Sequence, residues 1–340
     1  MTLMRRIKLK KLQDQTIVIT GASSGIGLAT ARMAAARGAR VLLTSRNEHD
    51  LQKVTREICA RGGRAGFVVA DVADPEAIER VAEAATREFG GFDTWVNNAG
   101  VSIYGKLTEV PLEDKRRMFE TNFWGVVHGC RTAVKHLRTK GGVIINIGSI
   151  VSDRSIPVQG IYSASKHAVM GYTDALRMEL EHDGLPISMT LVKPSSIDTP
   201  FLDHARNYMD EAPNLPPPVY DPDVVARTIL KCAERPMREI TVGGGGRFLA
   251  AMGRVAPRTM DRYMESVMFD QQRDPNRSPD RPDNLFGPGR DGLAHGPYSG
   301  HVMKSSAYTS AVMSDVARVL PFVAAGVAFA AGVRRWRSAA

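Results

Sequence analysis

The sequence predicts an α/β protein in which helices cover both faces of a doubly wound sheet of about seven parallel strands. Short apolar runs alternate with helical patterns through about the first 246 residues. The predicted strands are apolar at consecutive positions, which is typical of strands buried on both faces, as in a parallel sheet. A glycine-rich turn follows the first strand, where such a sheet offers a helix N-terminus to a ligand.

Helix and strand boundaries follow from local signals. Helices are expected from Ile26 to Arg37 and from Glu48 to Arg61, because glycine follows each of them. Another helix is expected from Asp221-Pro222, an N-cap with proline at the first helical position, to about Glu234. Strands are expected at residues 16–20, 40–44, 65–69, 94–97, 143–147, 187–192 and 239–242.

The alternation of predicted strands and helices ends near Gly246, and a C-terminal extension follows. The proline-rich segment 205–220 is expected to be a mobile flap, and 252–268 is expected to be helical. Residues 273–300 are rich in proline, glycine, aspartate and arginine, which predicts disorder or an extended arm. The predicted segments are a basic N-terminal arm (1–11), the α/β domain (12–246), a partly disordered extension (247–315) and an apolar helix (316–334).

The apolar run at 319–333 leaves two interpretations open. It is about 15 residues long and contains Pro321, whereas a membrane-spanning helix needs about 20 residues. The arginines that follow it suit a membrane interface, so membrane association through this helix is one interpretation. A helix that packs on the body of the protein or on a partner chain is the other.

Composition sets the broad class. The chain has 340 residues, 43% of them hydrophobic, which suffices for one large core. Much of the formal net charge of +9 lies at the two ends, which suits either an anionic surface or two solvated tails. Cys59, Cys130 and Cys232 form no disulfide framework or metal spacing, and a cytoplasmic setting fits. No apolar run follows the N-terminal charges, so no secretory signal is expected.

The turn after the first strand predicts a dinucleotide site. Its small residues let the backbone approach a pyrophosphate, and the helix N-terminus supplies N–H donors. The spacing is Gly-x-x-x-Gly-x-Gly, which differs from the usual Gly-x-Gly-x-x-Gly, so the turn alone is weak evidence. The candidate cofactor-binding residues here are Gly21, Ser23, Ser24, Gly25, Ile26 and Gly27.

The end of the second strand indicates which nicotinamide cofactor binds. An acidic residue at this position binds the 2′-hydroxyl of NAD, whereas an arginine accommodates the 2′-phosphate of NADP. Here Ser45 leaves room and Arg46 offers a planar cationic fork that suits a phosphate. The sequence therefore favours NADP over NAD.

Tyr162 and Lys166 are the candidate proton-transfer pair. They are four residues apart, so on a helix they share a face. A nearby ammonium favours the phenolate, and acid–base work near neutral pH needs the tyrosine pKa lowered by about 3 units from its usual value near 10. A tyrosine and a lysine at this spacing are common by chance, so the surrounding motifs must support the assignment.

These motifs together resemble the short-chain dehydrogenase/reductase family. The resemblance covers about Leu12 to Gly246, and the matching residues occur in the order and spacing of the family. It implies a Rossmann fold and an oxidoreductase that uses a nicotinamide dinucleotide. The residues that carry it are Thr20 to Gly27, Asn97-Asn98-Ala99-Gly100, Asn122, Ser149, and Tyr162 with Lys166.

The resemblance implies a role for each matching residue. Ser149 would bind the substrate oxygen, Tyr162 would transfer the proton, and Lys166 would lower the tyrosine pKa and hold the nicotinamide ribose. Asn122 would hold a water that links Lys166 to solvent. The implied cofactor contacts are Asp71 and Val72 for the adenine, Asn98, Ala99 and Gly100 beside the adenosine ribose, and Pro194, Ile197 and Thr199 for the carboxamide. One departure is Ser195, where the family usually has glycine.

The leading hypothesis is an NADP-dependent enzyme that transfers a hydride between NADP(H) and a carbonyl or secondary alcohol. We expect a small, rather apolar substrate and a homo-oligomer. The alternative is a non-enzymatic nucleotide sensor on the same fold. A nucleic-acid partner is not expected, because no basic stripe carries interleaved aromatic residues. The candidate pocket residues are Ile103, Tyr104, Ile150, Val151, Ile156 and Phe201, which are mostly hydrophobic.

Overall fold

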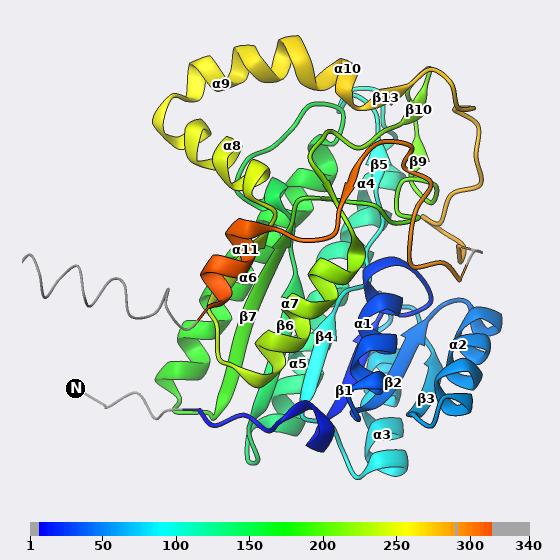
Figure 1. Ribbon diagram of the computed structural model, residues 1–340, viewed down its shortest axis with the longest axis vertical. Coiled ribbons are helices and arrows are strands. Elements are labelled where there is room, and N and C mark those ends of the chain that lie inside the picture. The colour runs from blue at the N-terminus through cyan, green and yellow to red at the C-terminus, as the bar shows by residue number, and fades with distance from the viewer. Residues whose placement is uncertain (1–6, 290–291, 315–340) are drawn as a thin grey trace, which may run out of the picture.

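The central sheet has seven parallel strands, as the sequence predicts (Figure 1). The computed structural model describes residues 7–289 and 292–314. The strand order is β12-β7-β6-β4-β1-β2-β3, and it runs in opposite directions from the β1/β4 boundary. The strands are β1 (Thr16–Thr20), β2 (Arg40–Ser45), β3 (Arg64–Val69), β4 (Thr94–Asn97), β6 (Gly142–Ile147), β7 (Ile187–Pro194) and β12 (Glu239–Val242).

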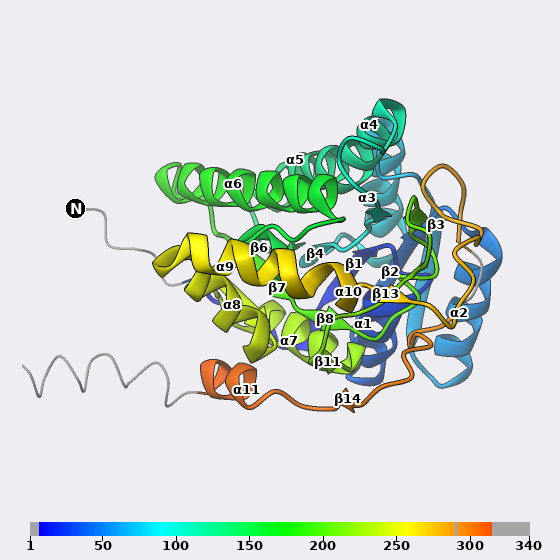
Figure 2. The same ribbon diagram turned by 90° about the horizontal axis from the view of Figure 1, so that it is seen from above.

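Helices cover both faces of this sheet because the apolar strand residues alternate in direction. Ile17 and Ile19 pack in one cluster with α1 (Gly25–Ala36), α2 (Glu48–Ala60) and α7 (Pro222–Glu234). Val18 packs in the opposite cluster with α3 (Pro75–Phe89), α5 (Gly125–Leu137) and α6 (Gly160–His182). Figure 2 shows the two helical layers on either side of the strands. The Rossmann-like doubly wound fold is thereby confirmed.

Capping residues begin several helices where the sequence predicts. The Asp221 carboxylate accepts a hydrogen bond from the backbone N–H of Asp223, with Pro222 at the first helical position of α7. The Asn47 side chain caps α2 in the same way, by accepting from the backbone N–H of Asp50. Because α2 begins at Glu48, Arg46 lies in the short connection that leads from β2 into the helix.

Short strands hold the proline-rich segment 205–220 against the body of the protein. The sequence predicts a mobile flap here, but backbone pairing attaches the segment at three places. β9 (Arg206–Asn207) pairs with β5 (Ile103–Tyr104), and β10 (Ala212–Pro213) pairs with β13 (Arg273–Asp274). β11 (Val219–Tyr220) lies between β8 (Ser196–Ile197) and β14 (Val302–Met303).

The C-terminal extension folds over the carboxyl ends of the strands (Figures 1 and 2). The helix expected over 252–268 is interrupted at Ala256, because Pro257 disfavours a helical conformation in the residue before it. It comprises α8 (Gly244–Val255), α9 (Pro257–Tyr263), a π-helical turn (Met264–Met268) and α10 (Phe269–Gln271). The described part of 273–300 then runs as an extended arm, which is one of the two predicted alternatives.

The remaining described helices are short. α4 (Leu112–Phe119) leads through the π-helical turn Glu120–Trp124 into α5, and α11 (Ala307–Met313) follows the arm. The 3-10 turns Leu12–Asp14 and Ile150–Ser152 complete the described elements. Within residues 7–289 and 292–314, no helix is both long and apolar enough to cross a membrane. The predicted apolar helix at 316–334 lies outside the described residues.

Candidate active site

A cavity of about 740 Å³ opens where β1, β4, β6 and β7 end. It lies at the point where the strand order reverses, which is where open α/β sheets bind their ligands. The turn after β1, the segment after β4, the start of α6 and the segment after β7 all contribute residues to its wall. The site is therefore assembled from distant parts of the chain by the parallel sheet.

The glycine turn leaves room for a ligand to approach the backbone. Gly21 and Gly25 adopt positive φ angles of 63° and 53°, which side-chain-bearing residues rarely adopt. A Cβ at Gly27 would lie 2.2 Å from the carbonyl oxygen of Gly21, so only glycine fits beneath the turn. Of the predicted residues, Gly21, Ser23, Ser24, Gly25 and Ile26 line the cavity. Gly27 instead lets the helix pack closely under the turn.

Thr20 and Asn98 lock the glycine turn to the end of β4. The Thr20 hydroxyl oxygen accepts hydrogen bonds from the backbone N–H groups of Asn98 (2.9 Å) and Ala99 (3.0 Å). The Asn98 amide in turn donates to the carbonyl oxygens of Thr20 (2.9 Å) and Gly21 (3.1 Å). Asn98, Ala99 and Gly100 also line the cavity, as predicted. The two loops therefore form one rigid wall.

Arg46 lies at the predicted place, but its guanidinium already has partners. It donates to the carbonyl oxygens of Asn284, Leu285 (3.4 Å) and Phe286 (3.3 Å), which belong to the C-terminal arm. Its Nη1 also lies 3.9 Å from Oδ2 of Asp71. The sequence contains no signal for the contacts with the arm, because those three carbonyl groups are about 240 residues away.

Asp71 forms an ion pair that the sequence did not reveal. Arg117 Nη2 donates to Asp71 Oδ2 at 2.5 Å, and the backbone N–H of Ala73 donates to Oδ1 at 3.0 Å. Burial opposes ionisation, yet the Ala73 hydrogen bond and the Arg117 guanidinium hold the pKa of Asp71 below its usual value. Asp71 and Val72 line the cavity, so both remain placed to contact an adenosine moiety.

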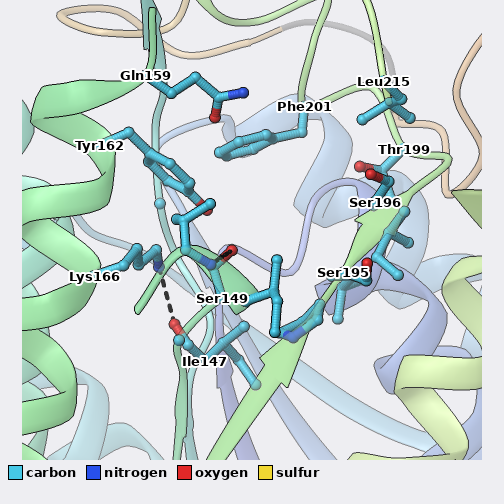
Figure 3. Close-up of a pocket in the computed structure, with 18 of the residues that line it drawn as sticks. Ile147, Ser149, Gln159, Tyr162, Lys166, Ser195, Ser196, Thr199, Phe201 and Leu215 are labelled. Carbon is cyan, nitrogen blue, oxygen red and sulfur yellow. Dashed lines mark hydrogen bonds between the residues drawn. The ribbon is translucent and has the colours of Figure 1, made fainter. Parts of the chain in front are cut away.

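The predicted proton-transfer residues converge on one side of the cavity (Figure 3). Tyr162 and Lys166 lie on the same face of α6, and Lys166 Nζ is 5.6 Å from the centre of the tyrosine ring. The ammonium donates to the carbonyl oxygen of Ile147 at 2.9 Å. Ser149 follows β6, and its hydroxyl oxygen accepts from the backbone N–H of Val151 (3.3 Å) while facing the cavity. Ser149 is thus both a cap and a wall residue.

Burial dominates the ionisation of this pair. It raises the pKa of Tyr162 to about 12, although the Ser149 hydroxyl lowers it in part. Burial also lowers the pKa of Lys166 to about 8. The sequence predicts a lowered pKa for Tyr162, but burial in the protein raises it, because the phenolate loses its hydration in this pocket. Both residues therefore favour their neutral forms more than they do in water.

Asn122 lies behind the pocket wall. It is fully buried in the π-helical turn between α4 and α5. Its Oδ1 accepts from the backbone N–H of Val101 (2.8 Å), and its amide nitrogen donates to the carbonyl of Val101 (2.9 Å) and the Ser165 hydroxyl (3.2 Å). Gly100 lies next to both Asn122 and Lys166, since a Cβ built on it would be 3.4 Å from Asn122 Oδ1 and 3.8 Å from Lys166 Nζ. One acceptor position on Oδ1 remains for a water.

The segment after β7 explains the departure at Ser195. A Cβ at Gly243 would lie 2.8 Å from the Cβ of Ser195, and one at Gly246 would lie 2.9 Å from its hydroxyl oxygen. The glycine-rich segment before and within α8 thus makes room for the serine side chain. The predicted carboxamide contacts Pro194, Ile197 and Thr199 all line the cavity.

The lining of the cavity fits a dinucleotide together with a second ligand. The glycine turn and the N-terminus of α1 line one end of the cavity, and a helix N-terminus suits a pyrophosphate. The glycines allow this turn to pack closely against Ala99 and Thr199. Tyr162, Lys166 and Ser149 lie farther along the same wall. Two features of the cavity wall were not predicted from the sequence: Gln159, at the N-cap position of α6, and the methionines of the extension. The spacing of Met260, Met264 and Met268 was a readable signal of a helical apolar stripe.

The fold and this site define an oxidoreductase of the dinucleotide-binding α/β class. The chain belongs to the short-chain dehydrogenase/reductase family, since the sequence profile described as "short chain dehydrogenase" matches residues 15–210. It is 44% identical over 336 residues to the uncharacterized oxidoreductase YxnA of Bacillus subtilis, covering 98% of this chain and 94% of that protein. It is 39% identical over 194 residues to a 3-ketodihydrosphingosine reductase of Bacteroides thetaiotaomicron, covering 57% and 68%.

Two solved structures share the fold. One is an alcohol dehydrogenase from Thermococcus sibiricus in complex with 5-hydroxy-NADP, with a TM-score of 0.60 and 27% identity over 67% of this chain and 95% of that one. The other is a short-chain dehydrogenase/reductase from Burkholderia phymatum in complex with NAD, with a TM-score of 0.62 and 26% identity over 80% and 98%. The two bind different nucleotides, so the comparison leaves the choice between NAD and NADP open.

Proposed function

We propose that this protein transfers a hydride between NADP(H) and a carbonyl or secondary alcohol, with Tyr162 as the general acid and base. The observation that carries the proposal is the convergence of Ser149, Tyr162 and Lys166 on one wall of a cavity whose other end is a dinucleotide cradle. A protein that only senses a nucleotide has no need of a buried lysine beneath a buried tyrosine. The sensor alternative is therefore less well supported.

Each residue of the proposed active site has a separate role in the reduction of a carbonyl group. NADPH supplies the hydride when it is bound. As negative charge develops on the carbonyl oxygen, the hydroxyl groups of Ser149 and Tyr162 donate hydrogen bonds to it, and Tyr162 gives up its proton. The Lys166 ammonium stabilises the resulting phenolate. Asn122 is proposed to hold the water that returns a proton to this pair.

The proposed cofactor contacts follow the cavity wall. The backbone N–H groups of Ser24 and Ile26 would hold the pyrophosphate at the N-terminus of α1, whereas the N–H of Gly25 donates to the carbonyl oxygen of Leu293 in the arm (2.8 Å). Arg46 would hold the 2′-phosphate, which favours NADP, and Asp71 with Val72 would border the adenine. Pro194, Ile197 and Thr199 would contact the carboxamide. In this division, residues 12–246 carry the cofactor and proton-transfer groups, and the extension completes the substrate side.

A panel of carbonyl compounds tests the proposed function. Purified full-length protein is mixed with NADPH or NADH and small ketones, aldehydes and longer 2-alkanones, and loss of cofactor absorbance is followed. We expect turnover of at least one carbonyl class, faster with NADPH than with NADH. Cofactor binding with no turnover of any carbonyl, and none of the matching alcohols in the reverse direction, would instead support the sensor.

A further inference from the structure

The C-terminal extension supplies the part of the cavity wall that lies beyond the proton-transfer residues. Its helices bring a set of apolar side chains onto the cavity, which we call the methionine lobe. Three of these side chains are almost fully buried, with exposed fractions of 8% for Met260, 5% for Met264 and 3% for Met268. The methionine lobe consists of Leu249, Met252, Met260, Met264 and Met268.

The methionine lobe continues the apolar wall of the candidate active site. Ile156 packs against the cluster that contains Tyr162 and also against the cluster of Met260, Met264 and Met268. The ring of Phe201 packs against that of Tyr162 at a tilt of 56°, with centroids 5.7 Å apart (Figure 3). Apolar side chains therefore connect the tyrosine to the extension through Ile156. Methionine side chains adapt their shape and suit a hydrocarbon ligand.

The substrate side of the cavity has little free charge. Arg46, Asp71 and Lys166 lie on the cofactor and proton-transfer side, and His204 packs against Gly289 of the arm. Among the described cavity residues, Arg154 is the remaining charged side chain. Its Nη2 forms an ion pair with Asp261 of α9, while its buried Nε has no hydrogen-bond partner among the described residues. An anionic ligand would find no unpaired cation along the methionine lobe, so burying its charge there would be costly.

The lobe is elongated. Met260, Met264 and Met268 are spaced four residues apart, so they form a stripe on one face of the helical segment. At roughly 1.5 Å of rise per residue the stripe is about 12 Å long. Two aromatic side chains that line the cavity are also exposed to solvent, Phe248 at 65% and Tyr263 at 38%. They mark an apolar mouth at this end.

From these contacts we propose that the substrate is a neutral, elongated and largely hydrocarbon ketone or secondary alcohol. Its reacting oxygen lies against Ser149 and Tyr162, and its apolar body lies along the methionine lobe toward Phe248. This inference rests on the proposed function, because it assumes that the carbonyl or alcohol reacts at Tyr162. It assigns to the extension the selection of the substrate.

A chain-length series tests this substrate class. We measure kcat/KM for 2-alkanones from 2-butanone to 2-undecanone with the full-length protein and NADPH. Burial of each added methylene on the lobe predicts an increase of about fourfold per carbon. A terminal carboxylate, as in 10-oxoundecanoate, is expected to lower kcat/KM at least 100-fold relative to 2-undecanone. Equal kcat/KM along the series, or equal use of the keto acid, would overturn the proposal.

Substitutions in the methionine lobe test whether the lobe causes the dependence of kcat/KM on chain length. Met264→Gln keeps the side-chain length but adds a polar group, and we expect it to lower the ratio of kcat/KM for 2-undecanone to that for 2-butanone about tenfold, while Met264→Leu restores the ratio. Met178→Gln is the matched control, because Met178 is 62% exposed on α6. If Met264→Gln does not fold, Met252→Gln replaces it as the test variant, with the same expected result. An unchanged ratio in the folded variants contradicts the assignment.

Binding separates this inference from the proposed function. Calorimetry with the Tyr162→Phe variant measures the affinity for 2-alcohols of four to eleven carbons without turnover. Tighter binding with each added carbon supports the substrate class even if no alkanone is reduced, in which case only the proposed reaction fails. Affinity that does not depend on chain length overturns the substrate class even if small ketones are reduced.

Discussion

At the scale of one residue, the buried ammonium of Lys166 lowers the stability of the fold, although the proposed reaction needs its charge. Its ammonium is buried, and the carbonyl oxygen of Ile147 is its one hydrogen-bond partner that the structure identifies. Burial lowers its pKa from 10.5 to about 8, so the folded protein disfavours the charged form. The lysine that would stabilise a phenolate therefore destabilises the fold near neutral pH.

The Lys166→Met substitution tests this balance. The folded pKa is below the unfolded one, so between pH 8 and 10.5 the unfolded chain binds more protons than the native state. The stability of the parent thus rises as pH rises through this window, whereas the variant lacks this contribution. The stability of the variant relative to the parent should fall by about 2 kcal/mol between pH 8 and pH 10. Urea unfolding at several pH values measures it, and a difference that does not change with pH would contradict the account.

Arg46 is the single residue to which we assign the proposed preference for NADP. Arg46→Asp is expected to weaken NADPH binding at least tenfold and NADH binding less than threefold, because only the former carries the 2′-phosphate. Fluorescence titration measures both. Arg56→Asp on α2 makes the same charge change at an exposed position and is the control. Equal losses for the two cofactors would point instead to the arm carbonyls that contact Arg46.

Sequence reasoning reached some residues of the site and not others, for a physical reason. Tyr162, Lys166 and the glycine turn are local patterns on one helix or one loop, and the structure brings them to one cavity. The partners of Arg46 and Asp71 come from Asn284 and Arg117, and only tertiary packing brings these together. The direction of the Tyr162 pKa was missed because the degree of burial cannot be read from the spacing of two residues.

At the scale of elements, a buried amide pair joins the extension to the helix that carries Tyr162. Gln159, the N-cap residue of α6, donates to Gln272 Oε1 at 2.7 Å. Gln272 is fully buried, and its amide nitrogen donates to the carbonyl oxygens of Pro157 (3.0 Å) and Met268 (2.8 Å). The end of α10 is thereby fixed to the start of α6, so the methionine lobe has a defined position relative to the tyrosine.

Gln272→Ala tests this link. The substitution leaves the Gln159 amide and two carbonyl oxygens without their partner, and each buried unsatisfied group is costly. We expect the free energy of unfolding to fall by about 2–4 kcal/mol. Gln13→Ala, at an exposed position, is the control. Urea unfolding of the parent and of both variants measures this change. Equal losses of unfolding free energy for Gln272→Ala and Gln13→Ala would contradict the link.

Helices and strands that depend on interactions between nearby residues could be predicted from the sequence, whereas those that depend on distant contacts could not. The seven strands and the helices from Gly25 to Glu234 come from local periodicity and caps, and the boundaries at Asp221 and Pro222 were predictable from two residues. The two-residue strands that hold 205–220 depend on backbone pairing with β5, β8 and β13 and leave no periodic pattern. A segment rich in proline was therefore expected to be mobile although it is attached.

At the scale of the whole molecule, the site depends on three parts that fold against one another. The parallel sheet brings four strand ends to one edge, the segment after β7 closes one side, and the extension covers the top (Figure 1). The proposed cofactor and proton-transfer residues lie at the strand ends, whereas α8, α9 and the π-helical turn Met264–Met268 complete the proposed substrate side. The same catalytic architecture could thus serve a substrate chosen by the extension.

The Tyr162→Phe variant tests the central claim most directly. The phenylalanine ring can keep the packing against Phe201 while it removes the proton donor. We predict that kcat for carbonyl reduction falls about 100- to 10,000-fold, because general acid catalysis typically contributes 10²–10⁴-fold, and that NADPH affinity changes less than about fivefold. Turnover and cofactor fluorescence are measured on the same preparation. Carbonyl reduction at close to the parent rate with bound NADPH would contradict the assignment of Tyr162 as the general acid.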